Sequence, residues 1–118
     1  MATHNDLGKK GEEIAAAYLV NKGHKILAQN YCHEKAEVDI ISLYSGTIIF
    51  TEVKTRSTDR YGYPEESVST KKKEKLREAM DHYLTENNIK EESRFDIVSI
   101  VINSQGTEVY HIQDAFYH

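Results

Sequence analysis

Two short segments separated by only two residues constrain this chain more than any other feature of its sequence. Residues 36–44 read Ala-Glu-Val-Asp-Ile-Ile-Ser-Leu-Tyr, residues 47–55 read Thr-Ile-Ile-Phe-Thr-Glu-Val-Lys-Thr, and Ser45-Gly46 lies between them. A two-residue loop that ends in glycine is typical of a β-hairpin. If Tyr44 pairs with Thr47, the register of the whole hairpin follows, since each further step along one strand is matched by a step along the other.

This register predicts that Asp39 lies opposite Glu52 and that Glu37 lies opposite Lys54, all four on one face of the hairpin. Opposed side chains have Cβ atoms about 4.5–5.5 Å apart, so two opposed carboxylates repel unless a cation or a proton lies between them. One interpretation is a Mg²⁺ or Mn²⁺ site, with Asp39 and Glu52 as ligands and Lys54 positioned to assist a water or a phosphate. The other is a set of solvated cross-strand ion pairs, which explains Glu37 and Lys54 well but Asp39 and Glu52 badly.

Periodicity and turn residues predict the remaining elements around this hairpin. The expected elements are a helix over residues 5–22, capped by Asn5 or Asp6 and ended by Gly23, a strand over 24–28, a loop over 56–66, a helix over 70–86 with Leu76, Ala79, Met80 and Tyr83 buried, and strands over 95–102 and 107–112. The order α-β-β-β-α-β-β predicts an α/β fold, a mixed sheet flanked by helices. At this length, residues 1–118 form a single domain.

The first helix offers a further carboxylate. At about 100° per residue, Glu13 falls on the solvated side of this helix and Glu12 at the edge of its apolar stripe. Glu12 can therefore reach inward to complete a metal shell. The alternative is an ordinary boundary glutamate, which is favourable near a helix N-terminus in any case.

Basic residues gather beside the predicted site, although the net charge of the chain is −4. Lys71, Lys72 and Lys75 cluster on one side of the second helix, either as a solvated face or as contacts to the phosphates of a nucleic acid. Tyr61 and Tyr63 of the loop are candidates for stacking on bases.

The single cysteine is typical of an intracellular protein. The only cysteine, Cys32, excludes an internal disulfide and is expected to be a small packing residue in a reducing cytoplasm. No apolar run is long enough to span a membrane. The six histidines lack zinc-site spacing, and Arg94 and Asp96 are expected to form a local ion pair.

Taken in order, a set of residues along nearly the whole chain resembles the YraN-like family of uncharacterised bacterial proteins. The set is Gly8, Gly11, Glu12, Ala15, Glu37, Asp39, Glu52, Val53, Lys54, Arg56, Gly62, Val68, Lys72, Lys75, Leu76, Arg94, Phe95, Asp96, Ala115 and Phe116. One departure is Ala36, where the family usually has glycine. That family is similar to the archaeal Holliday-junction resolvases and to the PD-(D/E)xK nuclease-like superfamily.

The resemblance implies a restriction-endonuclease-like fold of the tRNA-endonuclease and Holliday-resolvase type. Asp39, Glu52 and Lys54 match the superfamily's catalytic signature, and Glu12 matches a glutamate on the first helix of the resolvases, so the implied metal ligands are Asp39, Glu52 and Glu12. Arg56, Lys72 and Lys75 are then the implied nucleic-acid contacts. Relatives that form dimers favour a homodimer.

Three functions remain open at this point. The first is a Mg²⁺- or Mn²⁺-dependent endonuclease acting on DNA, with branched or damaged DNA as candidate substrates. The second is a nucleic-acid-binding domain on the same fold that does not cleave. The third is a partner-binding or structural module whose charged face is only solvated.

Overall fold

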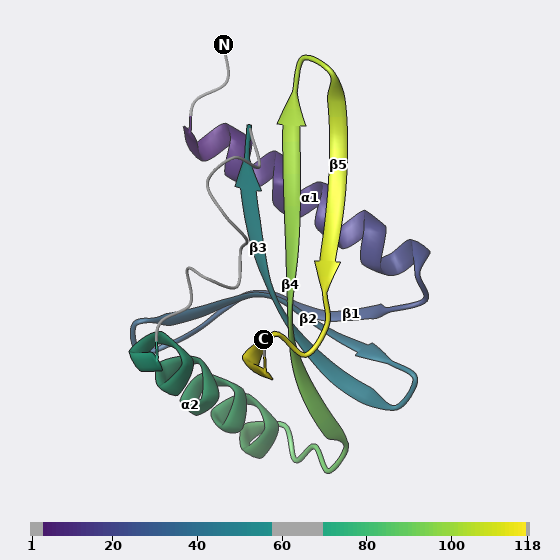
Figure 1. Ribbon diagram of the computed structural model, residues 1–118. Helices are drawn as coiled ribbons and strands as arrows, with labels where there is room; N and C mark the ends of the chain where they lie inside the picture. Colours follow the sequence, from purple (N-terminus) through teal and green to yellow (C-terminus); the bar gives the residue numbers. More distant parts are fainter. Residues whose placement is uncertain (1–3, 58–69, 118) are drawn as a thin grey trace.

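The computed structural model describes residues 4–57 and 70–117 and contains the predicted order of elements (Figure 1). The elements are α1 (His4–Asn21), β1 (Lys25–His33), β2 (Ala36–Tyr44), β3 (Thr47–Arg56), α2 (Thr70–Glu86), β4 (Glu92–Asn103), β5 (Gly106–Ile112) and a 3-10 turn η2 (Ala115–Tyr117). The α/β class and the order α-β-β-β-α-β-β are therefore confirmed.

The β2–β3 hairpin has the predicted register. Tyr44 pairs with Thr47, and the ladder continues to the pair Ile40–Thr51. Ser45 and Gly46 both have positive φ angles, 52° and 79°, the combination that a type I′ hairpin turn requires. The two turn residues thus set the register through local backbone geometry.

The five strands form one mixed sheet in the order β1-β2-β3-β4-β5. Only β3 and β4 are parallel, because the chain crosses through α2 between them; the other neighbours are antiparallel. Figure 1 shows β1 and β2 running across the direction of β4 and β5, so the sheet is strongly twisted.

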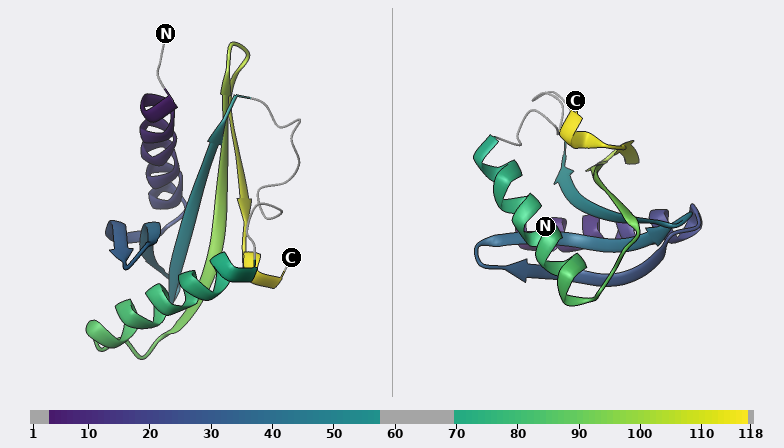
Figure 2. Two further views of the ribbon diagram at one scale, coloured as in Figure 1. Left: turned by 90° about the vertical axis from the view of Figure 1, so that its left-hand side faces the viewer. Right: turned by 90° about the horizontal axis from the view of Figure 1, so that it is seen from below.

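Each face of the sheet has its own apolar core. On one face, α2 contributes its buried residues Leu76, Ala79, Met80 and Tyr83, the four that the sequence predicts. On the other face, Ala15 and Leu19 of α1 pack on the opposite side chains of the sheet, and the two views of Figure 2 show a helix on either side. Residues 95–101 of β4 are buried without interruption, as expected for a strand covered on both faces.

The ends of some elements differ from the prediction, chiefly at the start of α1 and the end of β1. Helix α1 already includes His4, so Asn5 and Asp6 lie in its first turn and do not cap it. Its C-terminal end agrees with the prediction: Gly23 has a φ of 104° and the His24 amide donates to the Leu19 carbonyl, which is a Schellman motif. Strand β1 runs to His33, five residues beyond the predicted end, because it pairs with β2 along its length.

Three further expectations concern Cys32, the 56–66 loop and the absence of a membrane span. Cys32 is exposed, so its predicted role in packing is wrong; its side chain alternates away from the buried face of the edge strand β1. Most of the predicted 56–66 loop, with Tyr61 and Tyr63, lies outside the described residues. Among the helices described, neither combines the length and the apolar character that a membrane span requires.

Candidate functional site

Three carboxylates meet where α1 crosses the far end of the β2–β3 hairpin. Glu12 of α1 and Glu37 and Asp39 of β2 each place one oxygen within 4.8 Å of the other two. Glu12 is half-buried and Glu13 is exposed, as the helical geometry predicts. Helix α1 therefore does bring a third acidic side chain to the hairpin.

A glycine allows α1 to come this close. A Cβ atom built on Gly11 would lie 1.9 Å from the Thr55 Oγ1 atom of β3, a separation that two non-bonded heavy atoms cannot adopt. Gly8, one turn earlier, has no heavy atom within 4 Å of the equivalent position. The backbone contact at Gly11 thus sets the height of Glu12, the next residue, above the sheet.

Asp39 does not face Glu52 across a regular ladder as the register predicts. The β2–β3 pairing ends at Ile40–Thr51, and the Asp39 Oδ2 atom instead accepts a hydrogen bond of 2.8 Å from the Val53 amide. Val38 packs in the core under α2, whereas Ile40 packs in the core under α1. The alternation of side chains is therefore broken at Asp39, which lies between the two faces.

Asn30 holds two of the three carboxylates and was not identified from the sequence. Its amide nitrogen donates to Glu12 Oε1 at 2.9 Å and to Glu37 Oε1 at 3.2 Å. Its φ angle is 53°, a conformation that asparagine tolerates better than most residues. The regular β1–β2 pairs Gln29–Ile40 and Tyr31–Val38 flank it. Asn30 of β1 therefore lies opposite Asp39 of β2.

Glu37 was predicted to lie opposite Lys54, and this is wrong, because the β2–β3 pairing ends at Ile40–Thr51. Lys54 instead forms an ion pair with Glu52 of its own strand. The Lys54 Nζ atom lies 3.3 Å from Glu52 Oε1, and Lys72 Nζ of α2 lies 2.6 Å from the same oxygen. The second oxygen of this carboxylate, Glu52 Oε2, is buried without a hydrogen-bond partner among the described residues. Glu52 thus has one oxygen held by two lysines and one that accepts no hydrogen bond from residues 4–57 or 70–117.

Two hollows meet at Asp39. One, of about 210 Å³, lies on the α1 side and is lined by Glu12, Asp39 and Lys54, among others. The other, of about 280 Å³, lies on the α2 side and is lined by residues that include Glu37, Asp39, Glu52, Lys72 and Lys75. The predicted catalytic and metal-binding residues Glu12, Asp39, Glu52 and Lys54, and the predicted contacts Lys72 and Lys75, each line one hollow or both, whereas Arg56 and Lys71 line neither.

The electrostatics of Asp39 reflect this crowding. Burial raises the pKa of its carboxyl to about 6; the hydrogen bond from the Val53 amide lowers the pKa, and the neighbouring charges of Glu12, Glu52 and Glu37 raise it. A carboxyl group with such a pKa binds a proton or a cation readily near neutral pH.

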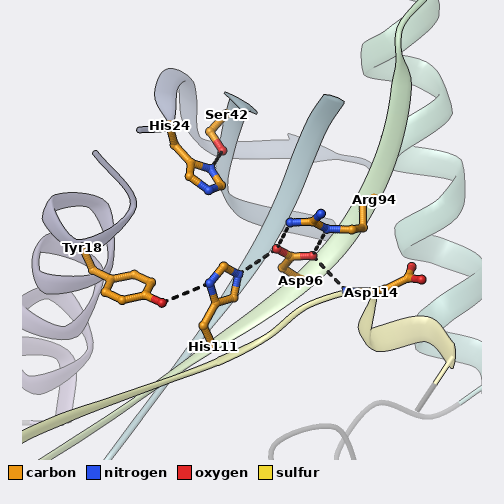
Figure 3. A network of polar contacts seen from close by, with 7 residues as sticks. All are labelled: Tyr18, His24, Ser42, Arg94, Asp96, His111 and Asp114. Carbon is orange, nitrogen blue, oxygen red and sulfur yellow. Dashed lines mark hydrogen bonds and ion pairs between the residues drawn. The ribbon is translucent and has the colours of Figure 1, made fainter. Parts of the chain in front are cut away.

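A second polar cluster joins the opposite ends of the chain (Figure 3). Arg94 and the fully buried Asp96 form the predicted ion pair, at 2.7 Å. Asp96 also accepts hydrogen bonds from His111 Nε2 and the Asp114 amide, and His111 Nδ1 lies 3.2 Å from the Tyr18 hydroxyl. Burial raises the Asp96 pKa, but its hydrogen bonds with His111, Arg94 and Asp114 outweigh this and lower it. The cluster ties β4, β5 and α1 together.

Comparisons with known proteins agree with the resemblance seen in the sequence. A model of the uncharacterised protein family UPF0102 matches residues 11–100. The chain is similar to a UPF0102 protein of Christiangramia forsetii, with 50% identity over 100% of this chain and 99% of the relative. A UPF0102 protein of Flavobacterium psychrophilum is 40% identical over the same shares of the two chains. One of Phocaeicola vulgatus is 42% identical over 99% of this chain and 97% of its own. The chain therefore belongs to the uncharacterised family UPF0102, the YraN family.

Proposed function

We propose that this protein is a metal-dependent nuclease that hydrolyses phosphodiester bonds in DNA. The observation that carries the proposal is the group Glu12, Glu37 and Asp39, whose oxygens lie within 4.8 Å of one another, with Lys54 lining the same hollow as two of them. A cluster of carboxylates beside a lysine and a basic helix offers what phosphodiester hydrolysis needs.

The donor set fits a hard divalent cation. All candidate ligands are carboxylate oxygens, the preferred ligands of Mg²⁺ and Mn²⁺. Opposite oxygens around Mg²⁺ are about 4.2 Å apart, so the group needs only small side-chain movements to close around an ion. The buried oxygen Glu52 Oε2, without a hydrogen bond in the described structure, has its acceptor capacity unused. Glu12 and Asp39 would hold the ion as expected from the sequence, together with Glu37. Glu52 lies outside this group of three and would join it from the α2-side hollow through its buried oxygen.

The chain's own residues supply binding and charge around the reacting phosphate. When bound, the cation makes water a better nucleophile and neutralises developing charge. Lys54 lines the α1-side hollow, where its ammonium group can orient the attacking water or donate to a phosphate oxygen. Lys72 and Lys75 line the α2-side hollow and would contact neighbouring phosphates, with Arg56 at the end of β3 as a further contact.

One observation favours the second candidate, a nucleic-acid-binding domain that does not cleave. Glu52 Oε1 is held at 2.6 Å by Lys72 and at 3.3 Å by Lys54. In a cleaving form, Lys72 would exchange Glu52 for a phosphate of the substrate. If it does not, the protein binds nucleic acid through its lysines without completing the metal shell.

The test is cleavage of duplex, flap, single-stranded and four-way-junction DNA, and of RNA, with Mg²⁺ or Mn²⁺. Cleavage should disappear in Asp39→Ala and in Glu52→Ala, and also in Glu12→Ala, while its exposed neighbour variant Glu13→Ala stays active. Activity that survives in Asp39→Ala and Glu52→Ala would come from a contaminant and would refute the proposal.

Calorimetric titration with Mn²⁺ separates the two candidates without a substrate. The nuclease requires Mn²⁺ binding that Asp39→Ala abolishes, whereas DNA binding with no Mn²⁺ binding favours the second candidate. Sedimentation of the same preparation tests the homodimer that the family resemblance implies.

A further inference from the structure

A third hollow adjoins the α2-side hollow and is not lined by Glu37, Asp39 or Glu52. It has a volume of about 440 Å³ and lies between the β1–β2 turn and α2, and we call it the turn hollow. It is lined by His33, Glu34, Lys35, Ala36, Lys75 and Glu78. Three of these residues, Lys35, Ala36 and Lys75, also line the hollow that contains Asp39 and Glu52. The two hollows therefore lie next to each other, and the α2-side hollow connects the turn hollow to the candidate metal centre.

An aromatic platform forms one wall of the turn hollow. The His33 ring is stacked on the His82 ring, with centroids 4.1 Å apart and an interplanar angle of 27°. The Tyr31 hydroxyl lies 2.7 Å from His82 Nδ1, and the Tyr31 ring packs edge-on against the buried Tyr83. His33, which lines the hollow, is thus supported on one face of its ring by His82.

The junction between the two hollows is cationic. Lys35 and Lys75 line both hollows, and neither makes an ion pair or a side-chain hydrogen bond within the part of the chain that the structure describes. Lys72, by contrast, is engaged with Glu52. Lys35 and Lys75 thus present two ammonium groups that a phosphate can bridge.

The far end of the turn hollow has the opposite charge. Glu34 and Glu78 line it, and carboxylates repel phosphate but accept hydrogen bonds from the amino groups of bases. The hollow therefore has a place for a phosphate at the lysines and a place for a base beside His33 and the two glutamates. Its volume is that of a small-molecule site, which suits one nucleotide and not a duplex.

We propose that the turn hollow binds one nucleotide of a single-stranded segment next to the bond that is cleaved. Its phosphate lies between Lys35 and Lys75, and its base extends the His82–His33 stack. The inference rests on the proposed function and deepens it, since it assigns the path of a substrate strand and favours substrates with an unpaired segment at the cleavage position. Aromatic stacking combined with lysine contacts is how single strands are generally bound.

The inference is tested by binding in EDTA, where no cleavage takes place. Fluorescence anisotropy compares three probes: a labelled 12-nucleotide deoxycytidine strand, an abasic strand of the same length, and a duplex. Wild type should bind the deoxycytidine strand about tenfold more tightly than the abasic strand, since stacking on one base supplies a difference of this order. His33→Ala should lose this discrimination and His33→Phe should keep it.

The lysines are tested by the salt dependence of the same binding. Each phosphate contact to a single strand contributes about 0.7 to the slope of log K against log salt. Because both lysines contact the same phosphate, the double variant Lys35→Gln/Lys75→Gln should lower the slope by about that amount, and each single variant by less. Lys90→Gln, which removes an exposed lysine elsewhere on the surface, is the matched control and should leave the slope unchanged.

Equal binding of the deoxycytidine and abasic strands by wild type, or equal binding of the duplex, would overturn the inference. The outcome is separable from that of the nuclease proposal. If the binding pattern holds but no substrate is cut, the nuclease fails and the strand path remains. If DNA is cut while the His33 and lysine variants bind as wild type does, the strand path fails and the nuclease remains.

Discussion

Replacing Asp39 by asparagine should make the protein more stable at neutral pH while removing its metal site. The carboxyl is half-buried and close to three other acidic side chains, and its pKa is raised from 3.8 to about 6, chiefly by burial. Ionising this carboxyl therefore costs more free energy in the folded protein than in the unfolded chain. Asparagine has the same shape, carries no charge, and can still accept the hydrogen bond from the Val53 amide.

The magnitude follows from the shift. A pKa change of one unit corresponds to about 1.4 kcal/mol, so a rise from 3.8 to about 6 corresponds to about 3 kcal/mol as an upper limit. The sign follows from proton binding: between these pH values the folded state binds more protons than the unfolded state, so wild-type stability falls as pH rises through this window. The advantage of Asp39→Asn should be full above about pH 7 and vanish near pH 4.

Urea unfolding of both proteins at pH 4, 6 and 7.5 measures this difference directly. Adding Mn²⁺ at about 100 times its dissociation constant should then stabilise wild type by about 2.7 kcal/mol and leave Asp39→Asn unchanged. Glu13→Gln, which removes an exposed charge of the same helix as Glu12, should change stability by less than about 0.5 kcal/mol. An Asp39→Asn variant that is less stable than wild type at pH 7.5, with no narrowing of the gap in acid, would refute the electrostatic reasoning.

Three further predictions concern the supports of the site. Gly11→Ala should be about 1–3 kcal/mol less stable in urea unfolding than the matched Gly8→Ala, because only the former meets Thr55; equal stabilities would contradict the close approach. Asn30→Gly keeps the positive φ but loses the bonds to two carboxylates, so calorimetry should show Mn²⁺ affinity reduced tenfold or more. Asp96→Asn should cost about 3–5 kcal/mol in thermal or urea unfolding, because the half-buried Arg94 guanidinium loses its counter-charge. The substitution should also remove the loss of stability expected as pH falls through the lowered Asp96 pKa.

Local sequence patterns predicted most of the fold. The Ser45-Gly46 turn, the glycine end of α1 and the buried stripe of α2 are all as expected. Each of these features depends on backbone conformation or periodicity within a few residues, so a short stretch of sequence is enough to predict it. Glu12 was found in the same way, since its angle around the helix axis follows from its position in the sequence alone.

The predicted pairing at the end of the hairpin failed for a tertiary reason. Beyond Thr51, β3 no longer pairs with β2 and continues alongside β4, with which it is parallel through Arg56. The prediction that Asp39 lies opposite Glu52, and Glu37 opposite Lys54, assumed that the β2–β3 ladder continues to these residues, and it does not. Alternation of side chains could not reveal where one strand leaves another.

The sequence alone therefore determined which helices and strands form, in what order, and which side of each helix is apolar, because these properties depend on neighbours in the chain. Only the tertiary structure decided that Glu37 joins Glu12 and Asp39, that Asn30 bridges two of these carboxylates across 18 and 7 residues of chain, and that Lys72 holds Glu52. Those contacts join α1, β1, β2, β3 and α2, so they depend on how the helices lie against a twisted sheet.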